Sequence, residues 1–274
     1  MKETDEFAEE IFCLKYELNT LASVLLRNES ERWLPGFLHE RTEYSHVERY
    51  KLACKYTSQK NVLDVACGIG KGSSMMAQEG GAALVNGFDI QPEAVRYANW
   101  RNAAPNLTFS VVDAETMDIV EAYEMAVSFE TIEHLHNYRS FLINVNKSIR
   151  AGGYLLISTP ISAASVDSNP INPYHTREWG FTEFQKVLNE FFSIEKIFVQ
   201  LYPPSQVPIN TPRKGIIEDL IGKIKRKLGF AQILEQVKES ANGFSKIEEY
   251  TGQYAEEELG VSRVGYQIVL ARKN

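Results

Sequence analysis

Two neighbouring segments of the chain combine carboxylates with a glycine-rich turn, a combination suited to ligand binding. In the first, an apolar run that contains Asp64 leads into a turn with glycines at 68, 70 and 72; in the second, an apolar run ends in Asp89. Glycine carries no side chain and accepts positive φ, so this turn can bend sharply and bring the backbone close to a ligand. A carboxylate at the tip of the second strand can accept both hydroxyls of a ribose. Asp64 stands where a dinucleotide-binding strand would be apolar, so the pattern favours a ligand with an ammonium group and a ribose over a pyrophosphate.

Acidic and imidazole side chains gather at two later positions. Glu130, Glu133 and His134 leave the end of an expected strand together, and His175 lies on the loop after the next strand. Those loops are neighbours in a parallel sheet, so the carboxylates and imidazoles form a candidate site for Mg²⁺, Mn²⁺ or a similar cation. The alternative has His134 as a metal-free general base or a helix-start residue, and Glu133 as a solvated helix residue. His136 faces elsewhere on any helix and is expected at the surface.

The order of apolar runs and helical spacings predicts the scaffold that positions these groups. Strands are expected near 61–66, 83–89, 107–112, 123–129 and 153–159, and helices near 71–79, 92–102, 114–119 and 137–149. Regular alternation of strand and helix is typical of an α/β fold, a parallel sheet with helices on both faces. Ligands of such sheets bind beyond the carboxyl ends of the strands. The residues expected at those ends are Asp64, Gly68, Asp89, Asp113 and Glu130.

Helices precede this core, and a long segment interrupts its end. Helical spacing predicts an amphipathic helix over 7–25 and a second helix over 44–56. A helix near 182, a strand over 192–200 and a final strand over 265–271 complete the pattern. About 60 residues separate the last two strands, which is long for a connection inside a compact domain. We expect one domain over 1–274, with an N-terminal helical extension at 1–57, a core at 58–200, an insertion at 201–262 and the last strand at 263–274.

The insertion contains a basic segment with an apolar stripe, residues 215–230. A lid or dimer helix with solvated lysines is the simplest interpretation. A helix on an anionic membrane surface and a helix that meets a phosphate of the substrate are the alternatives.

Composition excludes several classes of protein. Hydrophobic residues at 44% and charged residues at 24% are ordinary for a globular protein, and the net charge of −7 argues against broad nucleic-acid binding. No apolar stretch approaches the length of a membrane span, and the acidic start does not suit a signal peptide. The cysteines at 13, 54 and 67 show no metal-type spacing, so a reduced, cytoplasmic protein is expected. A homodimer is a further expectation.

The loop from Asp64 to Gly72, followed by Asp89, resembles motif I and the next acidic position of the class I S-adenosylmethionine-dependent methyltransferases. The resemblance implies a Rossmann-like, mostly parallel seven-stranded sheet in which the last two strands pair as an antiparallel hairpin. The long segment before the last strand is then an insertion. The cofactor-binding residues that it implies are Asp64, Gly68, Gly70, Asp89, Ile90, Asp113, Ala114 and Glu130.

Roles follow from the same resemblance. Asp64 and the glycine-loop backbone would hold the methionine amino and carboxyl groups, and Asp89 would bind the ribose. Ile90 would pack on the adenine, and Asp113 with the amide of Ala114 would contact the adenine edge. The structural alternative gives these carboxylates to helix N-caps, a common role for aspartate after a strand.

Six motifs occur in a fixed order along the chain: Glu31–Pro35, His46–Tyr50, Asp64–Gly72, Ser128–His134, Ser158–Pro160 and Asn172–Trp179. Together they look like bacterial methyltransferases encoded with glycosyltransferases and sugar-nucleotide enzymes for surface polysaccharides, a resemblance that covers residues 31 to about 200. The Glu-x-x-Glu-His segment, with a later histidine, also resembles the small-RNA 3′-end 2′-O-methyltransferases and the ubiquinone-pathway O-methyltransferases. These resemblances imply methyl transfer to an oxygen of a sugar or a polysaccharide precursor, with His134, His175 and Glu133 as the catalytic group. A natural-product phenol or an RNA 3′ end as acceptor, and a non-catalytic cofactor-binding subunit, are the alternatives.

One earlier motif of this series lies just before the core. His46, Arg49 and Tyr50 recur at helical spacing. They either close over the cofactor or serve as ordinary core and surface residues of a helix.

Overall fold

The computed structural model describes residues 2–23, 40–202 and 246–274. These residues fall into two compact units: residues 2–23, 40–45 and 202 belong to the first, and His46–Leu201 with Lys246–Asn274 form the second. The first unit contributes the helix α1, Lys2–Ala22, and the start of α2, Glu40–Thr57. The basic segment 215–230, the first part of the motif series at 31–35 and most of the expected insertion lie outside the described residues. The expectation of a single domain over 1–274 stays a prediction.

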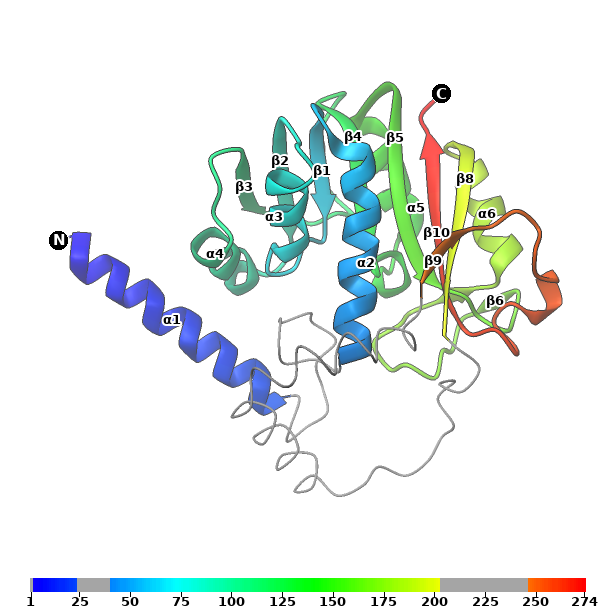
Figure 1. Ribbon diagram of the computed structural model, residues 1–274, viewed down its shortest axis with the longest axis horizontal. Coiled ribbons are helices and arrows are strands. Elements are labelled where there is room, and N and C mark those ends of the chain that lie inside the picture. The colour runs from blue at the N-terminus through cyan, green and yellow to red at the C-terminus, as the bar shows by residue number, and fades with distance from the viewer. Residues whose placement is uncertain (1, 24–39, 203–245) are drawn as a thin grey trace. The chain divides into compact units, whose positions relative to one another are not determined.

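The second unit holds the α/β core (Figure 1). Its strands are β1 Asn61–Val65, β2 Leu84–Asp89, β3 Leu107–Val111, β4 Tyr123–Phe129, β5 Ile149–Pro160, β8 Ser193–Leu201, β9 Ile247–Glu249 and β10 Gly265–Arg272. Its helices are α3 Lys71–Gln78, α4 Pro92–Arg101, α5 Tyr138–Ser148 and α6 Phe181–Asn189. A separate ribbon joins β6, Val166–Asp167, to β7, Glu178–Trp179.

The sheet has the strand order β3-β2-β1-β4-β5-β10-β8-β9. The first five strands are parallel, whereas β10 runs antiparallel to both β5 and β8. The predicted α/β, mostly parallel sheet with a terminal antiparallel pair is therefore confirmed. The expected count of seven strands is wrong, because β9 pairs with β8 through Phe198 opposite Glu249 and adds an eighth strand.

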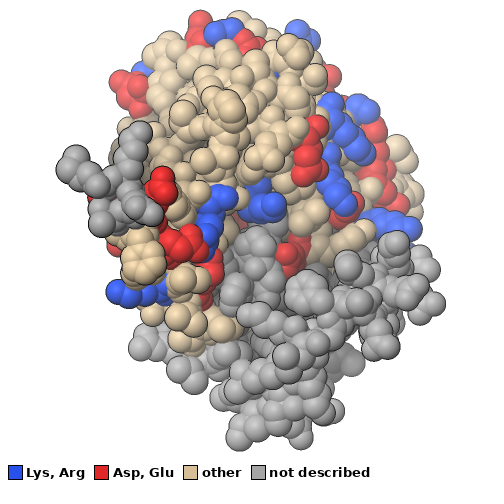
Figure 2. All heavy atoms as spheres, turned by 60° about the vertical axis from the view of Figure 1, so that its left-hand side comes forward, with Lys and Arg blue, Asp and Glu red and all other residues tan. Residues whose placement is uncertain are grey.

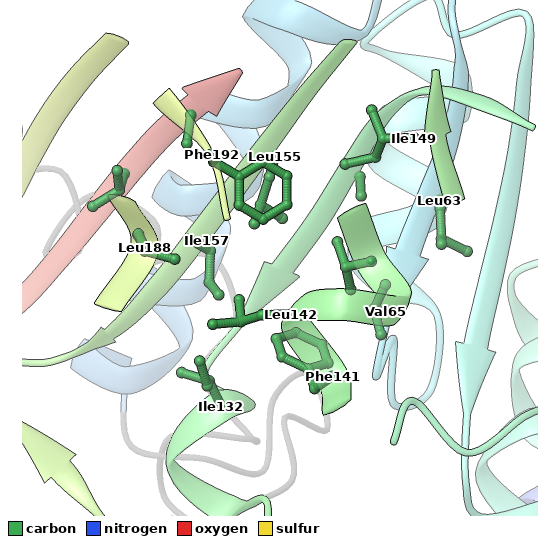
Figure 3. Packing of buried hydrophobic residues seen from close by; sticks show 14 of the residues in the cluster. Leu63, Val65, Ile132, Phe141, Leu142, Ile149, Leu155, Ile157, Leu188 and Phe192 are labelled. Atoms are coloured by element: carbon green, nitrogen blue, oxygen red, sulfur yellow. The ribbon is translucent and has the colours of Figure 1, made fainter. Parts of the chain in front are cut away.

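Alternation along the buried strands separates the two faces of the sheet. Leu63 and Val65 of β1 belong to a core cluster with α5 and α6, and Figure 3 shows them among Ile132, Phe141, Leu142, Ile149, Leu155, Ile157, Leu188 and Phe192. Since side chains on a strand point alternately to opposite faces, Asp64 points to the other face. There Tyr50 of α2 contacts it. The helices α3 and α4 pack on this second face. The Phe109 ring of β3 lies so close to Gly70 and Gly87 that a Cβ on either glycine would clash with it.

Two expected elements differ from the structure. The helix expected over 114–119 is wrong: residues 114–116 form a turn and 117–119 are irregular, and the Asn144 side chain donates to the carbonyls of Ala114 and Glu115. The strand expected from residue 153 begins at Ile149. The helix expected near 182 is α6, and the early amphipathic helix is α1, with Phe7, Ile11, Leu14 and Leu18 exposed.

Figure 2 shows acidic and basic side chains interspersed over the described part of one face of the molecule. Among the described helices, none is both long enough and apolar enough to cross a membrane. The homodimer stays a prediction.

Candidate functional site

The glycine-rich turn after β1 has a backbone conformation that requires glycine. Gly68 and Gly70 have φ of 58° and 77°, in the left-handed region that favours glycine. A Cβ on Gly70 would lie 2.3 Å from the Phe109 ring, and one on Gly72 would lie 2.0 Å from the Tyr50 ring. The turn therefore needs glycine both for its backbone and for its packing, and Gly70 leads directly into α3.

Asp64 is fully buried at the centre of this edge of the sheet. Its carboxylate accepts a hydrogen bond from Ser73 Oγ at 2.6 Å and a longer one from the Tyr50 hydroxyl at 3.3 Å. Burial raises the pKa of Asp64 to about 7, even though the hydrogen bonds from Ser73 and Tyr50 lower it. The group therefore changes charge near neutral pH.

Asp89, at the end of β2, is held in a fixed orientation by the backbone. Oδ2 accepts from the amide of Gly68 at 2.9 Å, and Oδ1 accepts from the amide of Gln91 at 2.9 Å. A carboxylate oxygen has two lone pairs, so each oxygen can still accept from a ligand hydroxyl. Ile90 is 60% exposed beside it, as an apolar surface at this edge.

Asp113 and Ala114 lie on the turn that follows β3. Asp113 Oδ1 accepts from the amide of Glu115 at 2.8 Å, which is the local backbone capping that we gave as the structural alternative. The Ala114 carbonyl accepts from Asn144. An adenine contact of Asp113 and Ala114 stays a prediction.

Glu130, at the end of β4, has an unusual backbone. Its φ is 52°, which costs energy in a residue other than glycine and is found most often at functional sites. Ser158 of β5 fixes the side chain, since its hydroxyl donates to Glu130 Oε1 at 2.7 Å. Glu130 is not one of the residues whose ligand atoms cluster within metal-binding range, which in the described chain are Glu133, His134 and His175.

Glu133 is a fully buried carboxyl group in a short helical turn, Ile132–His134. Oε2 accepts from the Thr159 hydroxyl at 3.2 Å, but Oε1 has no hydrogen-bond partner among the described residues. Burial, followed by repulsion from Glu130, raises the pKa of Glu133 well above its usual range. The Glu133 carbonyl accepts from the amide and hydroxyl of Thr176, which anchors the β5–α6 loop beside it.

Beside Glu133 the rings of His134 and His175 contact each other, with ring centroids 4.8 Å apart and the ring planes nearly perpendicular. Nδ1 of His134 donates to the Tyr174 carbonyl at 3.0 Å, and Nδ1 of His175 donates to Glu178 Oε1 at 2.5 Å. In these tautomers Nε2 of each ring carries the lone pair. The ligand atoms of Glu133, His134 and His175 all lie within 4.8 Å of one another. His136 is exposed and outside the group, as expected.

Several residues that hold these groups were not singled out from the sequence. Ser73 donates a hydrogen bond to Asp64, and Thr159 donates one to Glu133. Asn172 Nδ2 donates to His175 Nε2 at 2.9 Å. Asn172 and Glu178 are three residues before and after His175, and that spacing is the one signal that could have found them. Ser73 and Thr159 carry no such signal, because only the fold brings them near their partners.

Comparison with known proteins matches a profile described as a methyltransferase domain to residues 56–202, more than half of the chain. A probable S-adenosylmethionine-dependent methyltransferase of Mycolicibacterium smegmatis is 29% identical over 162 residues, 58% of this chain and 62% of that protein. A probable phthiotriol/phenolphthiotriol dimycocerosates methyltransferase of Mycobacterium ulcerans is 31% identical over 124 residues, 44% of this chain and 48% of its own. The chain thus matches less than two thirds of the length of these curated relatives.

Solved structures agree on the fold. The cyclase SpnF has a TM-score of 0.56 at 16% identity, with 94% of each chain covered. An S-adenosylmethionine-dependent methyltransferase from Mesorhizobium loti has a TM-score of 0.52 at 14% identity, covering 82% of this chain and 98% of its own. At such low identity these likenesses support the fold alone, whereas the profile match extends from the end of α2 to the end of β8. The chain therefore belongs to the methyltransferase domain family of enzymes.

Proposed function

We propose that the protein is an S-adenosylmethionine-dependent methyltransferase that methylates an oxygen of a sugar or a related surface-polysaccharide precursor. The observation that carries this proposal is the meeting of Glu133, His134 and His175 at the carboxyl ends of β4 and β5. β4 adjoins β1, which carries Asp64, and β5 lies on the other side of β4. A cofactor bound at Asp64 and Asp89 would therefore have acid–base groups on the neighbouring strands, where an acceptor would lie.

The chain's own residues supply positioning and proton transfer. Methyl transfer is an in-line displacement in which the acceptor oxygen forms a bond to the methyl carbon and the bond from that carbon to the cofactor sulfur breaks. The acceptor hydroxyl loses its proton, and Nε2 of His134 can accept it; Nε2 of His175 can do so once the ligand displaces the Asn172 amide that donates to it at 2.9 Å. The hydrogen bonds at both Nδ1 atoms hold the rings in the tautomer with that lone pair. Glu133 is fully buried and lies on the side of the site that faces away from solvent.

A divalent cation fits the same donors. Glu133 Oε1 is buried without a partner, and each histidine is oriented by an oxygen acceptor at Nδ1, an arrangement common behind metal-binding histidines. Carboxylate ligands suit Mg²⁺ and Mn²⁺, whereas imidazole ligands suit transition metals such as Fe²⁺ and Zn²⁺. Such a cation would lower the pKa of an acceptor hydroxyl. Glu130, held by Ser158, would lie outside this ligand set.

Methyl transfer to an acceptor panel tests the function. We expect product from a sugar, a uronic acid or a nucleotide sugar, and loss of most activity in EDTA with recovery on adding Mn²⁺. Full activity in EDTA would remove the cation and leave a histidine base. The panel includes phenols, because a mycobacterial relative is named for phenolphthiotriol dimycocerosates. Binding of the cofactor without transfer to any acceptor would favour a non-catalytic subunit.

The raised pKa of Asp64 gives the cofactor site a pH dependence. A protonated Asp64 cannot attract the methionine ammonium group, so S-adenosylmethionine affinity should fall as the pH drops below about 7, approaching tenfold per pH unit. Calorimetry across this range in the wild type measures the effect, and Asp64→Asn should bind weakly with a flat profile. A wild-type profile that is equally flat would contradict the assignment.

The same pKa shift should make the stability of the fold depend on pH in the opposite sense to cofactor affinity. Because its folded pKa of about 7 lies above the ordinary 3.8, its contribution to stability is present at acidic pH and lost as the pH rises through about 7. The difference in Tm between the cofactor-free wild type and Asp64→Asn should therefore move in favour of the variant with rising pH.

A further inference from the structure

Arg49 is a buried cation of α2, one residue before Tyr50, whose hydroxyl contacts Asp64. The Arg49 side chain is 1% exposed. Nη1 donates to Gln200 Oε1 at 2.8 Å, Nη2 lies 3.3 Å from His46 Nδ1, and the guanidinium stacks 4.5 Å above the Tyr266 ring. Burial, followed by the Arg49 charge, lowers the pKa of His46 well below its usual value, so a neutral ring accepts from Arg49.

This guanidinium has no anionic partner in the part of the chain that the structure describes. Among the described residues, no carboxylate lies within ion-pair distance of Arg49, and its Nε has no hydrogen-bond partner at all. A buried charge without a counter-charge costs stability, and an apolar residue of similar size often serves a structural role better. An unsatisfied buried donor calls for an explanation such as a water or a ligand.

The position of Arg49 points to the acceptor side of the site. Its partners Gln200 and Tyr266 lie in one register row with Pro160, at the carboxyl end of β5. The next residue of α2, Tyr50, instead reaches Asp64 on β1 and packs on Phe129 of β4. The two side chains therefore leave α2 toward different strands, one toward the cofactor turn and the other toward β10 and β8.

A second unsatisfied group lies near this row. Glu133 is bonded to Thr159, the residue before Pro160, and its Oε1 has no partner. Burial holds the pKa of Glu133 well above its usual range although the Arg49 charge acts to lower it, and Arg49 and Glu133 form no ion pair. A cation and a carboxyl group that stay apart, each with an unsatisfied atom, suit a ligand that carries both an oxyanion and a hydroxyl.

We propose that Arg49 binds an oxyanion of the acceptor, so that the substrate is an acidic hydroxyl compound such as a uronic acid or a phosphorylated sugar. This inference rests on the proposed function. Arg49 sets specificity by pairing its guanidinium with the oxyanion, while Gln200 and Tyr266 hold that guanidinium in place. The acceptor hydroxyl then falls toward Glu133, His134 and His175.

Calorimetry in the presence of S-adenosylhomocysteine tests the pairing, with glucuronate and glucose 1-phosphate as charged probes and glucose as the neutral match. The wild type should bind at least one charged probe about tenfold or more tighter than glucose. Arg49→Met should remove this preference, leave S-adenosylhomocysteine affinity within about twofold and keep or raise the Tm. Arg139→Met changes an exposed arginine of α5 and should leave every constant unchanged. Binding of glucuronate would identify the recognised oxyanion as a carboxylate, and binding of glucose 1-phosphate would identify it as a phosphate.

A second variant keeps the Arg49 guanidinium in place and changes its partner instead. Gln200→Glu places a carboxylate against Arg49 Nη1, so the guanidinium gains an internal partner and the charged probe should lose its advantage over glucose. A wild type without preference for either charged probe, or a preference that survives in both variants, overturns the proposal. A tenfold loss of S-adenosylhomocysteine affinity in Arg49→Met also overturns it, and assigns Arg49 to the cofactor carboxylate. Failure of the wild type to bind S-adenosylhomocysteine would instead contradict the proposed function.

Discussion

Asp89→Ala is expected to weaken S-adenosylmethionine binding by at least about tenfold while the fold survives. Each charge-assisted hydrogen bond from a ribose hydroxyl to the carboxylate contributes about 1.5–3 kcal/mol, and tenfold in affinity corresponds to about 1.4 kcal/mol. The substitution also removes the acceptors of the Gly68 and Gln91 amides, so the glycine turn loses the group that fixes it. Calorimetry at neutral pH measures the dissociation constant, and circular dichroism follows the fold.

The matched control for this change is Glu93→Ala. Glu93 is an exposed carboxylate in the first turn of α4, a few residues from Asp89, and it belongs to no part of the site. Its removal should leave the dissociation constant unchanged. Equal affinity in Asp89→Ala and the wild type would remove Asp89 from the cofactor site and leave it as a backbone cap.

The geometry of the glycine turn and of Asp89 could be predicted from the sequence because its signals are local. Gly68 and Gly70 adopt the positive φ that glycine allows, and Asp89 reaches back to the amide of Gly68 within one strand–helix–strand unit. Strands β1 and β4 are buried on both faces and appear as short apolar runs. A pattern of this kind needs no knowledge of the rest of the chain.

The parts that were missed depend on contacts between distant segments. The turn at 114–116 is contacted by Asn144 of the later helix α5, and the short strand β9 pairs with β8. The burial of Glu133 and its bond to Thr159 also arise only in the fold, so the sequence left open whether this carboxylate was solvated. Long-range packing of this kind overrides local propensity.

His134→Ala is expected to lower kcat on the order of 10²–10⁴-fold, the usual size of a general acid–base contribution. The imidazole is oriented by the Tyr174 carbonyl and lies against His175, on the strand ends that adjoin the cofactor strand. The glycine turn and Asp89 do not contact it, so S-adenosylmethionine affinity should stay within about twofold of the wild type. Steady-state rates on the best acceptor from the panel, together with calorimetry for the cofactor, separate the two effects.

His136→Ala is the control, because it removes an exposed imidazole two residues away whose side chain lies outside the cluster. It should retain the wild-type rate. His175→Ala should resemble His134→Ala, and the double variant should lose little more than either single one if the two rings and Glu133 act as a unit. Additive losses would mean that the rings act separately. A wild-type rate in His134→Ala would remove the imidazole from the reaction and leave the cluster as a structural contact beneath the β5–α6 loop.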